Sequence, residues 1–382
     1  MKYILVINSG SATLKCKVFE VKSLQEKFKV IVERVGLNRS FLVYSYNRKE
    51  FKINFTAGLK DHRRVLKEVI KILPYKIYKN IRLIGHRVVH GGKEFIQPTI
   101  LNNSVIKKLR QYHEFASLHN PINFRCIEAA FKEFPQVRQV AVFDTGFFKD
   151  LAPHVFLYAL PIKYYRADNI RKYGFHGLSH ENMYEQAVKK TGKAKLNLIT
   201  CHLGSGSSIT AIKAGKVLDT SMGFSPLAGV VMGSRCGDID PYIPLYLAKN
   251  LKMTAEQINQ ELNFNSGFVG LFGTQDLREI LAASGVKVTG YRLEKKYSKV
   301  KKRMAKLTLD IFIYSVQKYV ASYAGLLGKV EAVVFSGGIG ERSEFIRKQI
   351  LQGVNFLHKP KVYLVKANEE AIIAKKIKKF VS

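Results

Sequence analysis

The stretch VINSGSATLKCKVF, residues 6–19, decides how this chain is interpreted. It consists of an apolar run, a short turn of glycine and small hydroxyl residues, and a second run in which apolar and polar residues alternate. The pattern predicts two β-strands joined by a tight turn. Successive backbone N–H groups and hydroxyls in such a turn can hold phosphate oxygens, so the turn is a candidate anion-binding loop.

The same pattern returns in the second half of the chain. Residues 196–221 predict a strand, the Gly/Ser turn HLGSGSS at 202–208, a second strand, a turn and a third strand. A third glycine-rich turn, GGIGE at 337–341, follows another apolar run. None of these turns completes GxxxxGK[ST] or GxGxxG, and the first two lead into strands, whereas those motifs lead into helices. The repeat predicts two α/β domains that face each other across a cleft.

Further elements follow from hydrophobic periodicity and turn signals. The predicted strands are 3–8, 15–21, 28–34, 41–46, the start of 81–92, 137–148 and 330–341. The predicted helices are 61–73, 102–115, 122–133, 254–262, 275–283, 302–327 and one that begins near Asn368. We expect a first domain at 1–150 and a second at 151–370, with the C-terminal helix, about 370–382, packing back on the first domain.

Length and composition limit the class of protein. A chain of 382 residues with 47% hydrophobic content is typical of two well-filled cores. No apolar run approaches the roughly 18 residues that a membrane span needs, and MKYILVI is too short for a signal peptide. The four cysteines are scattered without a CxxC pair, which favours reduced thiols in a cytoplasmic protein.

The net charge is unusual. Lys and Arg number 63 against 29 Asp and Glu, a formal charge of +34, which would attract a polyanion such as a nucleic acid. The lysines are nevertheless dispersed, and the densest block, 295–303, alternates with apolar positions as an exposed helix does. Because no nucleic-acid-binding motif accompanies the charge, we favour a solvated coat and expect no specific nucleic-acid partner and no membrane partner.

Several polar residues stand out by their surroundings. Arg87 and Arg235 are flanked by glycines, and an arginine offers a planar fork to a carboxylate or phosphoryl group. Asp144 ends an apolar strand, where it either caps the next turn or faces a cleft. His176 is by itself most simply a structural hydrogen-bonding residue. His180, four residues on, lacks the Glu of HExxH, which argues against a metal pair.

Taken in order, these motifs resemble the acetate kinase family over nearly the full length. The resemblance rests on NSGSATLK, GHRVVHGG, LHNPIN, FDTGFF, RKYGFHGLSH, HLGSGSS, DTSMGFSPLAGVVMGSRCGDIDP, SGGIGE and ANEEAIIA. It implies two actin-like, ribonuclease H-like domains flanking a nucleotide and substrate cleft. It also implies reversible in-line phosphoryl transfer between ATP and acetate, giving ADP and acetyl phosphate. The implied cofactor is Mg²⁺, which Mn²⁺ can replace, and the implied assembly is a homodimer through the second domain.

The resemblance also assigns roles to individual residues. Arg87 binds the carboxylate, Arg235 stabilises the transition state, His176 donates to phosphoryl oxygens, Asp144 is catalytic, and Asn8 and Glu369 are magnesium ligands. For Asp144 we prefer organisation of magnesium-bound water to proton abstraction, because an acetate nucleophile is already ionised. Glu369 could instead cap its helix.

The remaining implied contacts concern the nucleotide and the acyl group. The phosphates would meet Ser11, Thr13 and Lys15, although Lys15 could instead be an outward strand residue. The nucleotide would meet His202, Leu203, Gly204, Ser205, Gly206, Asp276, Leu277, Arg278, Gly338, Ile339, Gly340, Glu341 and Arg342. The acyl methyl would lie among Val89, Leu118, Phe175 and Pro226.

Three positions depart from the family pattern. Ser205 stands where Asn is usual, Ala12 replaces a serine, and Arg342 replaces a common Asn. None of these changes removes a charged catalytic group. Two other readings stay open: a kinase that prefers propionate or butyrate, since a pocket discriminates by only ~1–3 kcal/mol per methylene, and an actin-like ATPase with no carboxylate substrate.

Overall fold

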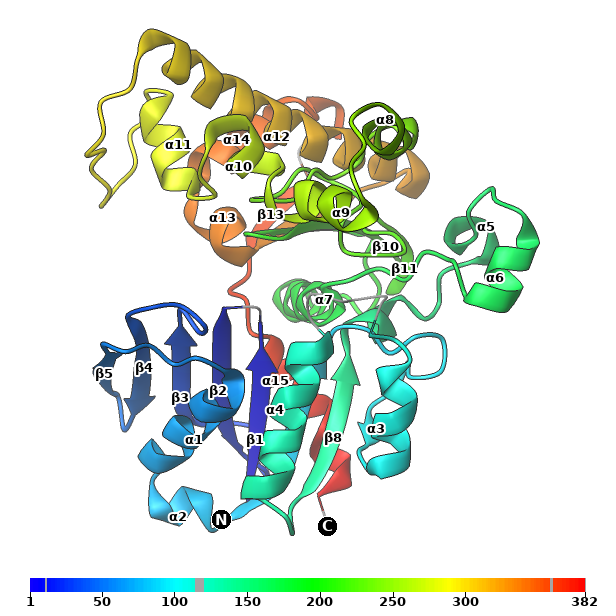
Figure 1. Ribbon diagram of the computed structural model, residues 1–382. Coiled ribbons are helices and arrows are strands. Elements are labelled where there is room, and N and C mark those ends of the chain that lie inside the picture. Colours follow the sequence, from blue (N-terminus) through cyan, green and yellow to red (C-terminus); the bar gives the residue numbers. More distant parts are fainter. Residues whose placement is uncertain (11, 114–119, 358–359, 382) are drawn as a thin grey trace. The chain divides into compact units, whose positions relative to one another are not determined.

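The computed structural model describes residues 1–10, 12–113, 120–357 and 360–381. The chain divides into two compact units, the first formed by Met1–Lys149 with Asn368–Ser382 and the second by Asp150–Ala367 (Figure 1). Each unit is built on one mixed β-sheet with helices packed on it. The predicted α/β fold class is therefore confirmed, with two β-sheets.

The first unit contains an eight-stranded sheet in the order β5-β4-β3-β2-β1-β6-β8-β7. Its strands are β1 (Tyr3–Ser9), β2 (Thr13–Glu20), β3 (Glu26–Glu33), β4 (Ser40–Tyr46), β5 (Lys49–Phe55), β6 (Ile81–Val88), β7 (Thr99–Ile100) and β8 (Arg138–Phe143). Its helices are α1 (His62–Ile72), α2 (Tyr75–Tyr78), α3 (Asn103–Arg110), α4 (Asn120–Glu133) and α15 (Glu369–Ile377), with 3₁₀ turns at Asp144–Phe148 and Lys378–Phe380. The antiparallel β1–β5 meander thus continues into β6 and β8, which run parallel to β1.

Residue alternation along β1 explains how helices cover both faces of this sheet. Leu5 and Ile7 point into a core shared with α1 and α4. On the opposite face α15 packs against β1 and β6 (Figure 1). A Cβ at Gly85 in β6 would lie 2.6 Å from Ile377 Cδ1 and 2.7 Å from Ile373 Cγ2, so the missing side chain lets α15 approach the sheet.

The second unit contains a five-stranded sheet in the order β11-β10-β9-β12-β13. Its strands are β9 (Leu198–Leu203), β10 (Ser207–Lys213), β11 (Lys216–Thr220), β12 (Ala332–Ser336) and β13 (Lys361–Leu364). Its helices are α5 (Pro153–Phe156), α6 (Ile162–Asp168), α7 (Gly177–Thr191), α8 (Tyr242–Asn250), α9 (Ala255–Phe264), α10 (Gly267–Phe272), α11 (Leu277–Ala283), α12 (Lys299–Leu327), α13 (Gly337–Arg342) and α14 (Glu344–Gln352), with a 3₁₀ turn at Asn355–Leu357.

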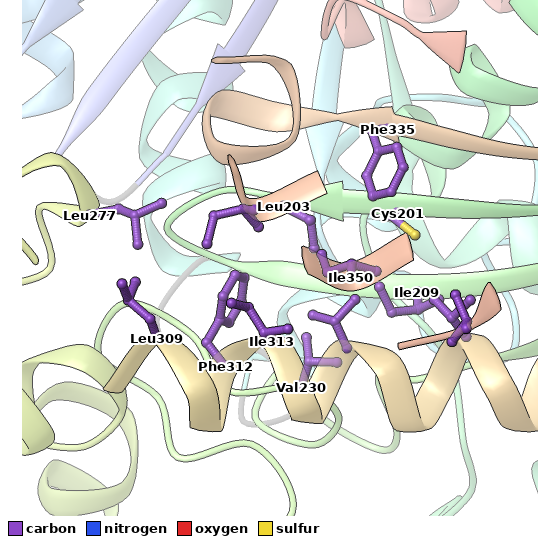
Figure 2. Close-up of a cluster of buried hydrophobic side chains, with 14 of the residues drawn as sticks. Cys201, Leu203, Ile209, Val230, Leu277, Leu309, Phe312, Ile313, Phe335 and Ile350 are labelled. Carbon is purple, nitrogen blue, oxygen red and sulfur yellow. The ribbon is translucent and has the colours of Figure 1, made fainter. Parts of the chain in front are cut away.

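The two faces of the second sheet differ in polarity. Figure 2 shows the apolar face, where Phe312 and Ile313 of α12 pack with Cys201, Leu203 and Ile209 of β9 and β10. The opposite face packs against α7. It presents buried hydroxyl residues, Thr200, Ser208 and Thr210, as well as apolar ones. Buried hydroxyls require hydrogen-bond partners. His180 of α7 is the partner of Thr200 and Ser208, and Thr210 bonds Thr220 of β11.

Some sequence predictions of elements were wrong. The strand predicted at 137–148 ends at Phe143, because Asp144 begins a 3₁₀ turn. GGIGE is not a turn but the start of helix α13, whose first N–H, that of Gly337, donates to Glu341 Oε1 at 3.1 Å. The helix predicted at 102–115 is confirmed only for Asn103–Arg110, and 114–119 lie outside the described residues. Strands β5, β7 and β13 were not predicted.

The cysteines and the helices allow two further statements. Cys16, Cys126, Cys201 and Cys236 are all free thiols, as predicted. Along the described stretches of chain, every helix is too short or too polar to cross a bilayer.

Candidate functional site

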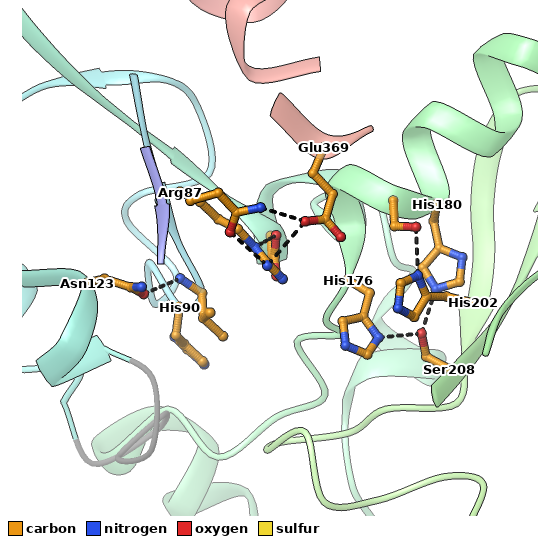
Figure 3. A network of polar contacts seen from close by, with 12 residues as sticks. Arg87, His90, Asn123, His176, His180, His202, Ser208 and Glu369 are labelled. Carbon is orange, nitrogen blue, oxygen red and sulfur yellow. Dashed lines mark hydrogen bonds and ion pairs between the residues drawn. The ribbon is translucent and has the colours of Figure 1, made fainter. Parts of the chain in front are cut away.

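Parallel strands bring three of the predicted residues of the first unit to one sheet edge. Asn8 lies near the end of β1, Arg87 near the end of β6, and Asp144 directly after β8. Because these strands are parallel neighbours, their carboxyl ends meet at the same edge. Glu369, the first residue of α15, joins them there and contacts Arg87 (Figure 3).

Arg87 and Asp144 form a bidentate ion pair. Arg87 Nε donates to Asp144 Oδ1 at 3.1 Å and Nη2 donates to Oδ2 at 2.6 Å. Asp144 is only 1% exposed. Burial disfavours the charged guanidinium, but the attraction of Asp144 and Glu369 outweighs it and raises the pKa of Arg87 above its ordinary value. Arg87 is therefore a fixed positive charge held by a carboxylate.

The remaining nitrogen of Arg87 connects the pair to Asn8 and Glu369. Arg87 Nη1 donates to Asn8 Oδ1 at 3.1 Å and to Glu369 Oε2 at 3.3 Å. Asn8 Nδ2 donates to Glu369 Oε2 at 2.8 Å and to Glu370 Oε1 at 2.6 Å. Since carboxylates only accept, the two glutamates fix the Asn8 amide with its nitrogen toward α15 and its oxygen toward Arg87.

Glu370 and Lys17 belong to this cluster and were missed from the sequence. Lys17 Nζ lies 3.6 Å from Glu370 Oε2 and 2.8 Å from Asn368 Oδ1. The available signal was the pair of adjacent acids in ANEEAIIA at the start of a helix. An acid on the buried side of a helix requires a buried cation or donor, but the sequence does not say which strand residue provides it.

The charge balance of this cluster fits a cation. Three buried carboxylates, those of Asp144, Glu369 and Glu370, face Arg87 and Lys17. Among the residues that the structure describes, no group of three His, Cys, Asp or Glu side chains is arranged to hold a metal ion by itself. A metal here would have few protein ligands and would take the rest from substrate and water, which is the usual manner of Mg²⁺.

Strand β2, which follows the turn after β1, begins with polar residues on the same face of the sheet as Asn8. In the antiparallel pair, Lys15 lies opposite Asn8, and directly opposite residues share a face of the sheet. Lys15 and Thr13 are half-buried and alternate with fully buried Leu14. The backbone carbonyl of Gly10 lies 2.9 Å from His62 Nε2 of α1, which fixes the turn. Ser11 lies outside the described residues.

Three of the four predicted apolar residues lie in the described part of the chain, and all three are buried. Val89 is 6% exposed, and its N–H donates to Asn123 Oδ1 at 3.2 Å. Phe175 is 1% exposed and Pro226 is also buried, both in the second unit. Leu118 lies outside the described residues.

In the second unit His176 occupies the N-cap of α7 with a left-handed φ of 57°. Its Nδ1 lies 2.9 Å from Ser208 Oγ, and the same oxygen lies 2.7 Å from His180 Nε2 (Figure 3). Burial, with a smaller contribution from His202, lowers the pKa of His180 well below its ordinary value. His176 and His180 are thus bridged by a hydroxyl.

Gly206 allows the β9–β10 turn to approach two predicted residues. A Cβ at Gly206 would lie 3.2 Å from His176 Nε2 and 3.5 Å from Arg235 Nη1. Arg235 Nη1 also donates to the backbone oxygen of Pro226 at 3.2 Å. Burial lowers the pKa of Arg235. The His202 ring lies 4.4 Å from that of His176. The second unit therefore gathers His176, His202, Arg235 and the glycine turn.

The other glycine-rich segment lies beside this turn. Gly337 has a φ of 81°, and a Cβ there would lie 2.5 Å from the backbone oxygen of Leu203. Only glycine permits so close an approach of the α13 N-terminus to the end of β9. Ser205 Oγ donates to Gln275 Oε1 at 3.3 Å. Leu203, Gly204 and Gly338 are consequently neighbours, whereas Arg342 lies exposed at the end of α13.

Three residues predicted to contact the nucleotide, Asp276, Arg278 and Glu341, have partners within the second unit. Arg278 Nε and Nη2 donate to Asp276 Oδ1 and Oδ2 at 2.9 and 2.7 Å, and Asp276 is the N-cap of α11. Leu277, between them, is largely buried. Glu341 Oε1 accepts from the N–H of Gly337 and from that of Ala367 at 2.9 Å, which fixes α13. These carboxylates stabilise the local backbone.

Comparison with known proteins identifies the family of the chain. A model of the Acetokinase family matches residues 3–379. An acetate kinase from Clostridium novyi is 39% identical, with 99% of this chain and 98% of that protein covered. Among solved structures, a Francisella tularensis propionate kinase has a TM-score of 0.89 at 34% identity, covering 98% of this chain and 99% of that chain. A Porphyromonas gingivalis acetate kinase has a TM-score of 0.85 at 32% identity and covers 100% of both chains. The chain belongs to the acetokinase family.

Proposed function

We propose that the protein reversibly transfers the γ-phosphoryl group of ATP to acetate, giving acetyl phosphate and ADP. The observation that carries the proposal is the buried Arg87 cluster with Asn8, Asp144 and Glu369 at one sheet edge. The names of the related acetate kinases in the acetokinase family support the same activity.

The chemistry explains why cations matter here. Acetate is ionised at neutral pH, so no base is needed to make it a nucleophile. The obstacle is the repulsion between the carboxylate and the γ-phosphoryl oxygens, and catalysis then consists of positioning and of positive charge around a loose transition state. We assign Arg87 the binding of the substrate carboxylate. We assign Arg235 the stabilisation of the negative charge on the transferring phosphoryl group.

The contacts of Arg87 divide these tasks among its nitrogens. Nε and Nη2 hold Asp144, whereas Nη1 is shared between Asn8 and Glu369. We assign Nη1 as the edge that turns to a substrate carboxylate. Asp144 accepts hydrogen bonds from the guanidinium, so we propose that Asp144 orients Arg87 and does not abstract a proton.

We further propose that Asn8 and Glu369 hold Mg²⁺, which Mn²⁺ can replace. The oxygens of both residues lie within hydrogen-bonding distance of the same Arg87 nitrogen, and the cluster around them has more carboxylates than cations. Mg²⁺ would neutralise charge on the nucleotide phosphates.

The nucleotide is assigned to the second unit, at the β9–β10 turn and the N-terminus of α13. Short glycine-rich segments with close backbone approach favour phosphate and sugar contacts. His176 is assigned as a donor to the phosphoryl oxygens. Ser205 and Arg342, the departures from the family pattern, adjust nucleotide affinity in this proposal.

The experiment that tests the proposal is trapping of the acyl phosphate. Purified protein is incubated with MgATP and hydroxylamine, with acetate, propionate or butyrate at equal concentration in parallel samples. We expect acetohydroxamate from acetate and less hydroxamate from butyrate. Faster reaction of propionate would favour the activity named for the Francisella relative. ADP release without hydroxamate would overturn the proposal in favour of an ATPase.

We also propose that two copies of the chain associate through the second unit. Helix α8 has no buried residue, and Tyr242, Leu245 and Tyr246 on it are 59%, 61% and 52% exposed. Such an apolar surface favours a protein partner. Sedimentation should give twice the chain mass for the native protein and the chain mass for Leu245→Glu. Leu37→Glu, at an exposed leucine of the first unit, is the matched control and should stay dimeric.

A further inference from the structure

A chain of buried hydrogen bonds leads from strand β9 to His176. Thr200 Oγ1 lies 2.7 Å from His180 Nδ1, His180 Nε2 lies 2.7 Å from Ser208 Oγ, and Ser208 Oγ lies 2.9 Å from His176 Nδ1 (Figure 3). Thr200, His180 and Ser208 are 0% exposed. We call these three residues with His176 the hydroxyl–histidine relay.

The number of protons in the relay limits how it can be arranged. Each hydroxyl has one proton to donate, and a neutral imidazole has one N–H. Burial keeps His180 neutral, because it lowers the pKa of that ring well below its ordinary value. A neutral His180 donates at one nitrogen and accepts at the other. The described hydrogen-bond contacts of the Ser208 hydroxyl are those to the two rings, so when Ser208 accepts from one ring it donates to the other. The bonds of the relay then run in one direction.

The distances around Thr200 select the direction. The Thr200 hydroxyl can donate either to His180 Nδ1 at 2.7 Å or to the backbone oxygen of Thr210 at 3.3 Å. The two acceptors compete for one proton, and the shorter contact is the stronger hydrogen bond, so we assign the Thr200 proton to His180 Nδ1. Thr200 therefore donates to His180.

We propose that the relay fixes His176 as the tautomer that carries its proton on Nε2. Thr200 donates to His180 Nδ1, His180 Nε2 donates to Ser208, and Ser208 donates to His176 Nδ1. His180, Ser208 and Thr200 are positioning residues that act through His176. Which ring nitrogen of a histidine carries the proton depends on the hydrogen-bond partner of the other nitrogen. For His176 that partner is the Ser208 hydroxyl, and Thr200 sets the direction in which Ser208 donates, through His180.

The tautomer matters because of where Nε2 lies. It is next to the Gly206 turn and near Arg235, the two features assigned to the nucleotide side of the reaction. A neutral ring with a proton on Nε2 can donate to a phosphoryl oxygen without adding a second positive charge beside the guanidinium. This last step rests on the proposed function, whereas the tautomer itself does not.

The test is a two-bond ¹H–¹⁵N correlation spectrum of protein labelled at histidine, recorded without substrate at a pH where the rings are neutral. It distinguishes protonated from unprotonated ring nitrogens, and the His176 signals are identified by their loss in His176→Gln. We expect the His176 proton on Nε2. A proton on Nδ1 would overturn the proposal from the wild-type spectrum alone.

Two matched variants test the role of the distant hydroxyl. Thr200→Val removes the donor that sets the direction, and should give a mixture of His176 tautomers and a roughly twofold lower kcat, since only part of the molecules is competent. Thr210→Val removes an equally buried hydroxyl that bonds Thr220 and should leave the spectrum unchanged. A Thr200→Val spectrum identical to wild type would contradict the relay. If wild-type protein forms no acyl phosphate, only the proposed function is contradicted, because the tautomer is measured without substrate.

Discussion

Replacing Arg87 by Met removes the cation that compensates the buried carboxylates of the first unit. Asp144 would keep a carboxylate at 1% exposure without its bidentate partner, and Glu369 would lose its contact to Nη1. Breaking a buried ion pair at one partner costs about 3–5 kcal/mol. Because the Arg87 side chain is 15% exposed, water reaches the site and we take the lower end, about 3 kcal/mol.

The assay is urea unfolding of wild type, Arg87→Met, Asp144→Asn and the double variant, monitored on a probe in the first unit. We expect Arg87→Met to lower the free energy of unfolding by about 3 kcal/mol and Asp144→Asn to restore much of that loss in the double variant. Arg87→Lys, which keeps the charge but not the fork, should fall between wild type and Met. A cost below about 1 kcal/mol, or additive single variants, would refute the buried pair.

Three further changes test the first unit by the same unfolding assay. Gly85→Ala places a methyl 2.7 Å from Ile373 Cγ2 and should cost about 1–3 kcal/mol by displacing α15; a neutral result would contradict the packing. Burial lowers the pKa of His86 to about 4 from an ordinary 6.5. Between these pH values the unfolded state binds more protons, so stability should fall by about 1.4 kcal/mol per pH unit as pH decreases. His86→Gln should lose that part of the slope, and an unchanged slope would refute the assignment. Glu370→Ala should cost about 2 kcal/mol through its buried hydrogen bond, whereas Glu344→Ala, at an exposed ion pair, should leave the stability nearly unchanged; equal costs would count against the cluster.

The sequence predicted the fold where periodicity and turn chemistry agree. The hairpins at Asn8–Lys15 and His202–Ser208 are present because small residues separate two runs with strand periodicity. Strand β5 was missed although Phe51, Ile53 and Phe55 alternate with polar residues in the sequence; in the structure every residue from Lys49 to Asn54 is exposed. GGIGE was taken for a turn because glycine disfavours helices, but the Glu341 side chain accepts from the first N–H of the helix and stabilises it.

The candidate site was predictable to the extent that its residues lie at strand ends. Asn8, Arg87 and Asp144 follow from three apolar runs and come together because those strands are parallel neighbours. Glu370 and Ser208 could not be found in this way. Their importance depends on which side chain from a distant element meets them, and neither periodicity nor spacing contains that information.

The most direct test of the central claim is a ³¹P NMR measurement of acetyl phosphate formed from MgATP and acetate. Wild type and Arg235→Ala are compared in parallel at saturating substrates. If the positive charge of Arg235 stabilises the transferring phosphoryl group, wild type forms acetyl phosphate and Arg235→Ala is slower by about 10³-fold or more. Equal rates for the two proteins, or no acetyl phosphate from wild type, would contradict the account.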